Sequence, residues 1–232
     1  MSIRSSITLI LAGIAPNLTF GHVSITSEVA YAGSHYETEF TVPHGCNGSD
    51  TQQVELSIPS GITGIRPLDS TFGPATIESN AEGNITKLIW TKSEGDLHSS
   101  DSHAYNFSFR SKLPDTPFTT YYFPTIQSCK TQEGQELEAE WVGTGDHHHS
   151  SIDSSVLPAP KIMIFPKRFP GWNKYTVNQH VHDLTVFSDA EIVWMGGSAY
   201  SANPETMALI EADANVNILV EIHPDSIIWV KY

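Results

Sequence analysis

The chain has 232 residues, with 26 acidic side chains against 12 Lys and Arg, 11 histidines and a formal net charge of −14 at pH 7. This acidity argues against nucleic acids and anionic membranes as partners, because binding either requires positive charge to neutralise phosphates. A hydrophobic content of 39% is that of a folded chain. The length allows one large domain, or a medium domain with a small second one.

Residues 1–21 are typical of an export signal. Residues 7–15 form an apolar run of signal-peptide length that is too short to span a bilayer. Cleavage after this run would leave Pro16 next to the cut, which signal peptidases disfavour, whereas cleavage after Gly21 leaves His22 as the new N-terminus. We therefore predict an exported protein, periplasmic or otherwise extracytoplasmic, whose mature chain begins at His22.

Export places the two cysteines, Cys46 and Cys129, in an oxidising compartment. A lone pair of cysteines usually forms a disulfide there. Closing so long a loop stabilises the fold by roughly 4–5 kcal/mol in the chain-entropy model. The alternative is that the two thiols bind Cu(I), although they do not form a CxxC-type cluster.

Residues 22–165 form a succession of short segments in which hydrophobic and polar residues alternate, separated by Gly, Pro, Asn, Asp and Ser. The clearest alternating segments are residues 54–58, 88–90, 105–109 and 137–141. Period-two alternation with frequent turns and no long amphipathic helix predicts an antiparallel β-sandwich, which we expect to be immunoglobulin-like.

A polar, Ser-rich connector occupies residues 143–160, and the alternation of hydrophobic and polar residues ends after residue 165. Residues 192–194 and 227–231 are predicted strands. Asn203 and Pro204 are typical of a helix start, with a capping side chain followed by proline at the first helical position. We therefore predict a small α+β module over residues 166–232.

His22 is the strongest candidate for chemistry, provided that it is the mature N-terminus. A terminal histidine offers its α-amine and its imidazole from one residue, and the two can chelate one metal ion. The amine titrates near pH 8 in the absence of a metal, so it is readily deprotonated by a metal at neutral pH. Nitrogen donors in a planar arrangement suit Cu(II). The alternative is that cleavage exposes a terminal histidine by chance.

Several motifs resemble those of the YcnI-like copper-binding family, and the likeness covers about residues 22–165. They are His22-Val23-Ser24-Ile25, Val42-Pro43-His44-Gly45-Cys46, Phe123-Pro124 before Gln127-Ser128-Cys129, and Glu140-Trp141. The resemblance implies an immunoglobulin-like sandwich, export, and Cu(II) held by a single-histidine brace. In that brace the N-terminal histidine chelates through amine and imidazole, a glutamate supplies oxygen, and a tryptophan packs close to the metal.

By this resemblance His22 is the brace histidine and Trp141 is the tryptophan. Trp141 shares a strand face with hydrophobic residues, so it can also be a plain core residue. His44 precedes a Gly-Cys turn, where its role can be limited to satisfying backbone groups.

The oxygen ligand is assigned to Glu37, although the family pattern puts the carboxylate one position earlier, at Tyr36. Strand alternation places Phe40 and Val42 on the core face and leaves Glu37 on the other face. Tyr36 and His35 remain alternatives to Glu37 as the third ligand. Without the resemblance, Glu37 would be interpreted as a surface charge.

Other histidines form possible further sites. A run in the connector can bind copper or nickel weakly or be a solvated loop; it consists of His147, His148 and His149. His180 and His182 alternate around one residue and can share a strand face, which alone is a weak signal.

We expect an exported protein, not an enzyme, that captures Cu(II) for copper trafficking or homeostasis. Its partners are the copper ion and possible copper carriers or a membrane copper transporter, with no nucleic acid and no evident small-molecule substrate. No nucleophile elbow, HExxH motif or phosphate-binding loop is present. One alternative is a copper monooxygenase-like enzyme that uses His103 or His147 as a second ligand. The other is an extracytoplasmic interaction module without metal.

Overall fold

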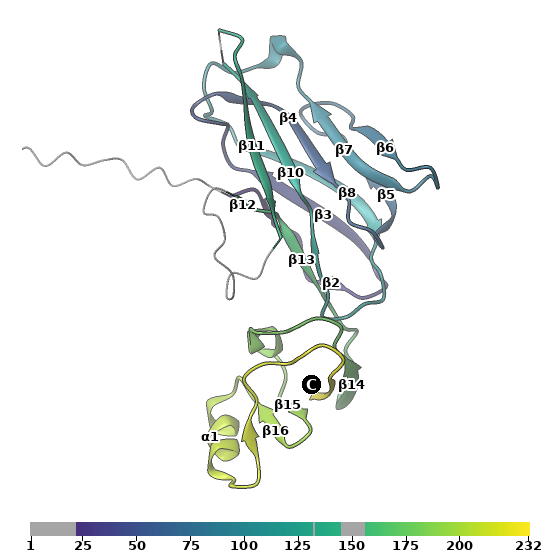
Figure 1. Cartoon of the computed structure of the whole chain (residues 1–232), viewed down its shortest axis with the longest axis vertical. Coiled ribbons are helices and arrows are strands. Elements are labelled where there is room, and N and C mark those ends of the chain that lie inside the picture. Colours follow the sequence, from purple (N-terminus) through teal and green to yellow (C-terminus); the bar gives the residue numbers. More distant parts are fainter. Residues whose placement is uncertain (1–21, 132, 145–155) are drawn as a thin grey trace, which may run out of the picture.

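The computed structural model describes residues 22–131, 133–144 and 156–232. These residues form a β-sandwich followed by a smaller C-terminal module, which lies below the sandwich in Figure 1. The expected signal peptide at residues 1–21 and the connector histidines at residues 147–149 lie outside the described residues.

One sheet of the sandwich has four strands in the order β1-β3-β8-β5. All of its pairings are antiparallel, and the bounds are Ser24–Ile25 for β1, His35–Val42 for β3, Tyr105–Lys112 for β8 and Thr63–Pro67 for β5. In β3, Thr38, Phe40 and Val42 are buried and Glu37 is exposed. The predicted alternation of this strand is therefore confirmed.

The opposing sheet has six strands in the order β12-β11-β10-β4-β7-β6. Its bounds are Leu157–Pro158 for β12, Glu136–Gly143 for β11, Thr125–Lys130 for β10, Asp50–Ser57 for β4, Ile85–Thr91 for β7 and Thr76–Ser79 for β6. Only the pairing of β11 with β12 is parallel among these neighbours.

The core of the sandwich consists of the inward-facing residues of both sheets. Its largest fully buried side chains are Trp90, Trp141, Phe40, Phe107, Phe109, Phe123, Leu56, Leu88, Leu113 and Ile164. Each of these aromatic side chains removes roughly 150–250 Å² from water, so they supply a large share of the hydrophobic stabilisation. The sandwich predicted from period-two alternation is confirmed.

A three-stranded sheet connects the sandwich to the C-terminal module. It has the order β2-β13-β9, with bounds Ala30–Tyr31, Lys161–Phe165 and Thr120–Tyr122. Phe118, just before β9, packs in the core of the C-terminal module rather than in that of the sandwich. The three-stranded sheet therefore lies between the core of the sandwich and the core of the C-terminal module.

The C-terminal module is a five-stranded sheet with one helix. The order is β14-β18-β15-β16-β17, with bounds Trp172–Thr176, Ile227–Lys231, Ile192–Met195, Ser198–Tyr200 and Asn217–Ile218. Helix α1 (Pro204–Ala212) begins as predicted, because the Asn203 side chain accepts hydrogen bonds from the backbone N–H groups of Glu205 and Thr206. The predicted strands at β15 and β18 are confirmed, and the sheet is wider than the sequence indicated.

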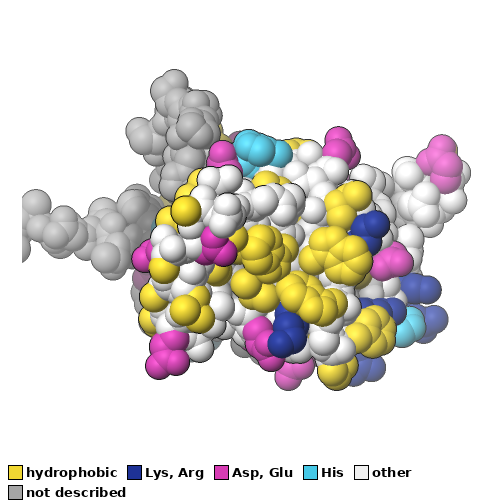
Figure 2. All heavy atoms as spheres, turned by 90° about the horizontal axis from the view of Figure 1, so that it is seen from below, with side chains coloured by type: hydrophobic (Ala, Val, Ile, Leu, Met, Phe, Trp, Pro, Cys, Tyr) yellow, Lys and Arg dark blue, Asp and Glu magenta, His cyan; other side chains and the backbone are white. Residues whose placement is uncertain are grey.

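The C-terminal module leaves several large hydrophobic side chains exposed, and Figure 2, viewed from its side, shows hydrophobic side chains gathered near the middle of the surface. The exposed residues in this module are Phe169, Trp172, Leu209, Ile218, Val220, Ile227 and Trp229. No helix in the described part of the chain is long and apolar enough to cross a membrane.

Candidate functional site

Pairing between β1 and β3 determines where His22 lies. Ser24 is opposite Thr41 in this antiparallel ladder, so continuing the register by two residues brings His22 opposite Pro43, just past the end of β3. Val23 is buried in the sandwich core and anchors the start of the chain, whereas His22 is exposed.

Trp141 lies beside His22, which is the arrangement that the resemblance implied. The two ring centroids are 5.8 Å apart with the planes inclined at 62°, an edge-to-face contact. Trp141 is 2% exposed and belongs to the sandwich core. It therefore serves as a core residue and also forms a rigid wall next to the His22 imidazole.

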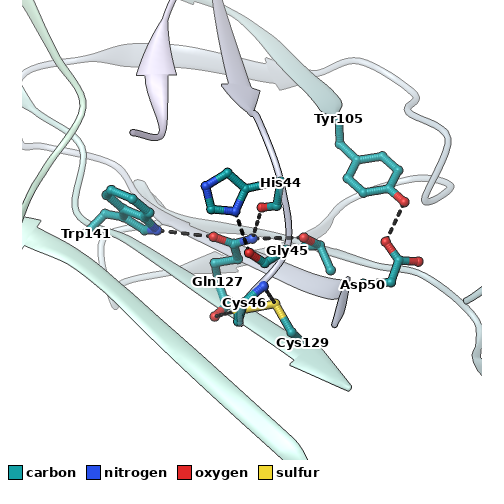
Figure 3. Close-up of a disulfide and its surroundings, with 9 residues drawn as sticks. His44, Gly45, Cys46, Asp50, Tyr105, Gln127, Cys129 and Trp141 are labelled. Atoms are coloured by element: carbon teal, nitrogen blue, oxygen red, sulfur yellow. Dashed lines mark hydrogen bonds between the residues drawn. A yellow bond between two sulfur atoms is a disulfide. The ribbon is translucent and has the colours of Figure 1, made fainter. Parts of the chain in front are cut away.

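Gln127 holds Trp141 and the loop after β3 in fixed positions (Figure 3). Its side-chain oxygen accepts a hydrogen bond from Trp141 Nε1 at 3.3 Å, and its Nε2 donates to the His44 carbonyl oxygen at 2.7 Å. The same Nε2 donates to Thr51 Oγ1 at 2.9 Å. Because Gln127 is 2% exposed, these hydrogen bonds form away from competing water and are costly to break.

A disulfide between Cys46 and Cys129 ties the same loop to β10. The predicted bond is confirmed, so these sulfur atoms are not free thiols for Cu(I). The Cys46 backbone N–H also donates a hydrogen bond to Cys129 Sγ at 2.8 Å. The loop carrying His44 is thus held by a covalent bond and by Gln127.

A hollow of about 550 Å³ opens between this loop and β11. It is lined by His44, Gly45, Cys46, Asn47, Gln127, Leu137, Glu138, Ala139, Glu140, Trp141 and Leu157. Among these residues His44 carries a side chain that can bind a metal ion on the Trp141 side. Glu138 and Glu140 alternate with the buried Trp141 along β11 and are exposed on the opposite face of the strand. The His44 Nδ1–H donates a hydrogen bond to the Gly45 carbonyl oxygen at 2.6 Å, which leaves the lone pair of the neutral ring on Nε2.

The structure does not bring Glu37 to His22. Glu37 lies six positions before Pro43 on the same extended strand, which corresponds to about 20 Å. Its carboxylate is 44% exposed and forms an ion pair with Arg110 Nε at 2.9 Å. The choice of Glu37 as the oxygen ligand is therefore corrected, because the antiparallel run of β1 along β3 carries His22 to the opposite end of β3.

The two alternatives for the third ligand lie at the same distant end as Glu37. His35 is exposed at the start of β3, and the Tyr36 hydroxyl donates a hydrogen bond to the Glu28 carbonyl oxygen at 2.5 Å. Burial raises the pKa of Tyr36. Neither side chain is available to a metal ion at His22.

A buried charge cluster that the sequence did not indicate lies near the disulfide. Asp50 accepts hydrogen bonds from Lys92 Nζ at 2.8 Å, from the Tyr105 hydroxyl at 2.6 Å and from the His98 backbone N–H at 2.7 Å. Burial acts to raise the pKa of Asp50, but these donors outweigh it and the pKa is lowered. Burial also raises the pKa of Tyr105, as does its hydrogen bond to the Asp50 carboxylate.

His103, one of the two expected second ligands for an enzyme, lies elsewhere. Its ring stacks on that of His98 with centroids 3.8 Å apart, and both line a separate hollow together with Lys92 and Tyr105. His147, the other expected ligand, lies outside the described residues.

Comparison with solved structures identifies the class of fold. An uncharacterised protein from Nocardia farcinica with an immunoglobulin-like fold matches with a TM-score of 0.50 and 19% identity, over 62% of this chain and 98% of that one. A cohesin–dockerin complex from Clostridium thermocellum matches less well, with a TM-score of 0.39 and 9% identity over the same shares of the two chains. The described chain is mainly β and its sandwich is immunoglobulin-like.

The family assignment rests on the sandwich. The family model of a domain of unknown function, DUF1775, matches residues 22–164, and the chain belongs to this family. No curated protein sequence matches. The matched residues begin at His22 and end within β13, so the C-terminal module lies beyond the family domain.

Proposed function

We propose that this chain is a YcnI-like, exported copper-binding protein that captures Cu(II) at its mature N-terminus for copper trafficking or homeostasis. The observation that carries the proposal is the edge-to-face contact of the His22 imidazole with the buried Trp141 ring. The family match supports it, because the match begins at the residue expected to follow signal-peptide cleavage.

The donor set fits Cu(II). After cleavage before His22, the α-amine and the imidazole of one residue form a compact chelate, and both nitrogen donors prefer Cu(II) among the common divalent ions. Trp141 closes one side of this chelate with an apolar ring that Gln127 holds in place. A rigid apolar wall limits the access of water and of competing ligands to the metal.

The further donors come from the hollow beside Trp141 rather than from Glu37. His44 is best suited, because its Nδ1–H is held by the Gly45 carbonyl oxygen while Nε2 carries the lone pair. Metal-binding histidines usually have their second ring nitrogen held in this way. Glu138 and Glu140 border the same hollow but are exposed on the face of β11 opposite to Trp141, so we propose water as the remaining oxygen donor.

Capture and release of copper require no chemical turnover. The formal net charge of −14 raises the local concentration of cations and favours weak contacts with positively charged partners. We propose copper carriers or a membrane copper transporter as those partners.

A copper monooxygenase-like activity is the second candidate, and His44 is the observation that favours it. A second imidazole beside the terminal histidine would give three nitrogen donors, an arrangement that such enzymes use. The rate of oxygen consumption by the copper-loaded protein in the presence of a reductant distinguishes the enzyme from the binding protein. A binding protein should consume oxygen no faster than the same concentration of free copper does.

A Cu(II) titration against a competing chelator tests the binding function. The protein starts at His22, and its matched control is the same chain with its α-amine acetylated, which removes the amine donor and keeps the imidazole. Both carry alanine in place of the three connector histidines at residues 147–149. We expect one equivalent of Cu(II), bound at least 100-fold more tightly than in the acetylated control. Equal affinity in the two proteins would overturn the proposal.

A further inference from the structure

Two short segments of the C-terminal module meet at one antiparallel bridge, outside the family domain. Val181 is opposite Ile222, and each backbone N–H donates to the carbonyl oxygen of the other residue at 2.9 and 3.0 Å. Both side chains are buried in the module's core. Side chains alternate between the two faces of paired strands, so the neighbours at positions 180, 182, 221 and 223 gather on the opposite side of the bridge.

Those four neighbours are three histidines around one carboxylate. His180 Nε2 and His182 Nδ1 lie 3.2 and 3.5 Å from Glu221 Oε2. His223 Nε2 lies 3.5 Å from Glu221 Oε1. The His180 ring lies 3.8 Å from that of His182 and 4.6 Å from that of His223, measured between centroids.

One nitrogen in this cluster faces the Glu221 carboxylate but makes no hydrogen bond of ordinary geometry. His180 Nε2 is buried and has no hydrogen-bond partner among the described residues, although Glu221 Oε2 lies within reach. A buried polar atom without a hydrogen bond is costly. A metal ion placed between the nitrogen and the carboxylate would satisfy both atoms.

We propose that His180, Glu221 and His223 form a second metal site that takes a four-coordinate divalent transition-metal ion such as Zn²⁺, with water or the neighbouring His182 in the fourth position. Ligand atoms of His180, Glu221 and His223 all lie within 4.8 Å of one another. In a tetrahedral zinc site with bonds near 2.0–2.1 Å, neighbouring ligand atoms are roughly 3.3 Å apart. The three nitrogen–oxygen separations are close to that spacing.

The cluster is open to ions from solvent and is held by both parts of the chain. The side chains of His180 and His182 are 28% and 26% exposed, and that of His223 is 63% exposed. His180 and His182 line a cleft of about 720 Å³ that also borders strands β9 and β13 of the connecting three-stranded sheet. Gln179, next to His180, accepts a hydrogen bond from the Thr120 backbone N–H at 2.8 Å. The expected ligands are therefore fixed where the module meets the sandwich.

Zn²⁺ alone is the probe, titrated into the mature chain against a chromophoric chelator. The parent protein has an acetylated α-amine at His22 and alanine at the three connector histidines, so that neither site competes for the ion. We expect one equivalent of Zn²⁺ to bind. Co²⁺ substitution should give the strong visible absorption of a tetrahedral site.

Two ligand variants test the assignment. His223→Ala alters the most exposed of the three histidines, and Glu221→Gln keeps the size of the side chain while removing its charge. Each should weaken Zn²⁺ binding at least tenfold, with a circular dichroism spectrum unchanged from that of the parent.

The matched control removes a different stacked histidine pair. The rings of His98 and His103 are also 3.8 Å apart, and a variant with alanine at both positions should keep the parent's affinity. A parent protein that binds no Zn²⁺, or ligand variants that keep the parent's affinity, would overturn the second site. Neither result bears on Cu(II) capture at His22, because the free amine is blocked in every protein of this series.

Discussion

Replacing Asp50 with asparagine tests the buried charge cluster beside the loop that carries His44. The Lys92 and Asp50 side chains are 4% and 0% exposed, and their charged atoms are 2.8 Å apart. The Lys92 ammonium also lies over the rings of Phe72 and Tyr105. Asparagine keeps the size of the side chain but removes its charge, so Lys92 is left as an unpaired buried cation.

Breaking a buried ion pair in this way costs about 3–5 kcal/mol of unfolding free energy. Urea denaturation of the oxidised protein, followed by tryptophan fluorescence, measures the loss. In the double variant Asp50→Asn, Lys92→Met no unpaired cation remains, and we expect it to recover most of the stability. A loss below about 1 kcal/mol for Asp50→Asn, the size expected for a solvent-exposed pair, would refute the reasoning.

Three further predictions concern the same region. Replacing Cys46 and Cys129 with alanine opens a bond between residues separated by 83 positions, and we expect a loss of about 4.5 kcal/mol in urea denaturation; a change below about 1 kcal/mol would contradict the entropic origin. Gly45→Ala should lower the unfolding free energy by about 2 kcal/mol or more, because the added Cβ would overlap the carbonyl oxygen four residues on; an unchanged melting temperature would show that the turn adapts. The lowered pKa of Asp50 means that the unfolded chain takes up its proton first as the pH falls. The stability that Asp50 contributes should therefore be present above pH 4, about the ordinary pKa of Asp, and be lost at lower pH. In Asp50→Asn the free energy of unfolding should therefore fall less below pH 4 than in the parent protein. Identical pH profiles of the two proteins would contradict this prediction.

Local patterns were enough to predict much of the sandwich and the helix start. The alternation of Phe40 and Val42 with polar neighbours is a property of one strand. The burial of Trp141 among exposed glutamates in β11 is likewise a property of one strand. The Asn203 cap depends on residues next to it in the chain. Each of these features is decided within a few residues, and each was predicted correctly.

The candidate site depended on pairings between segments far apart in the chain. Glu37 is on the solvent face, as alternation predicted, but the register of β1 against β3 carries His22 to the other end of the strand. Nothing within β3 encodes that register. His180 and His182 were a weak sequence signal for a metal site, because Glu221 and His223 come next to them only through the bridge between Val181 and Ile222.

Electron paramagnetic resonance of the one-to-one Cu(II) complex, in protein that begins at His22, tests the central claim most directly. The account predicts a single tetragonal signal with nitrogen hyperfine structure, which acetylation of the His22 α-amine abolishes. His44→Ala should alter the signal, whereas Glu37→Gln should leave it unchanged, since Glu37 lies at the far end of β3 paired with Arg110. An identical signal from the acetylated protein would contradict capture of Cu(II) by the N-terminal histidine.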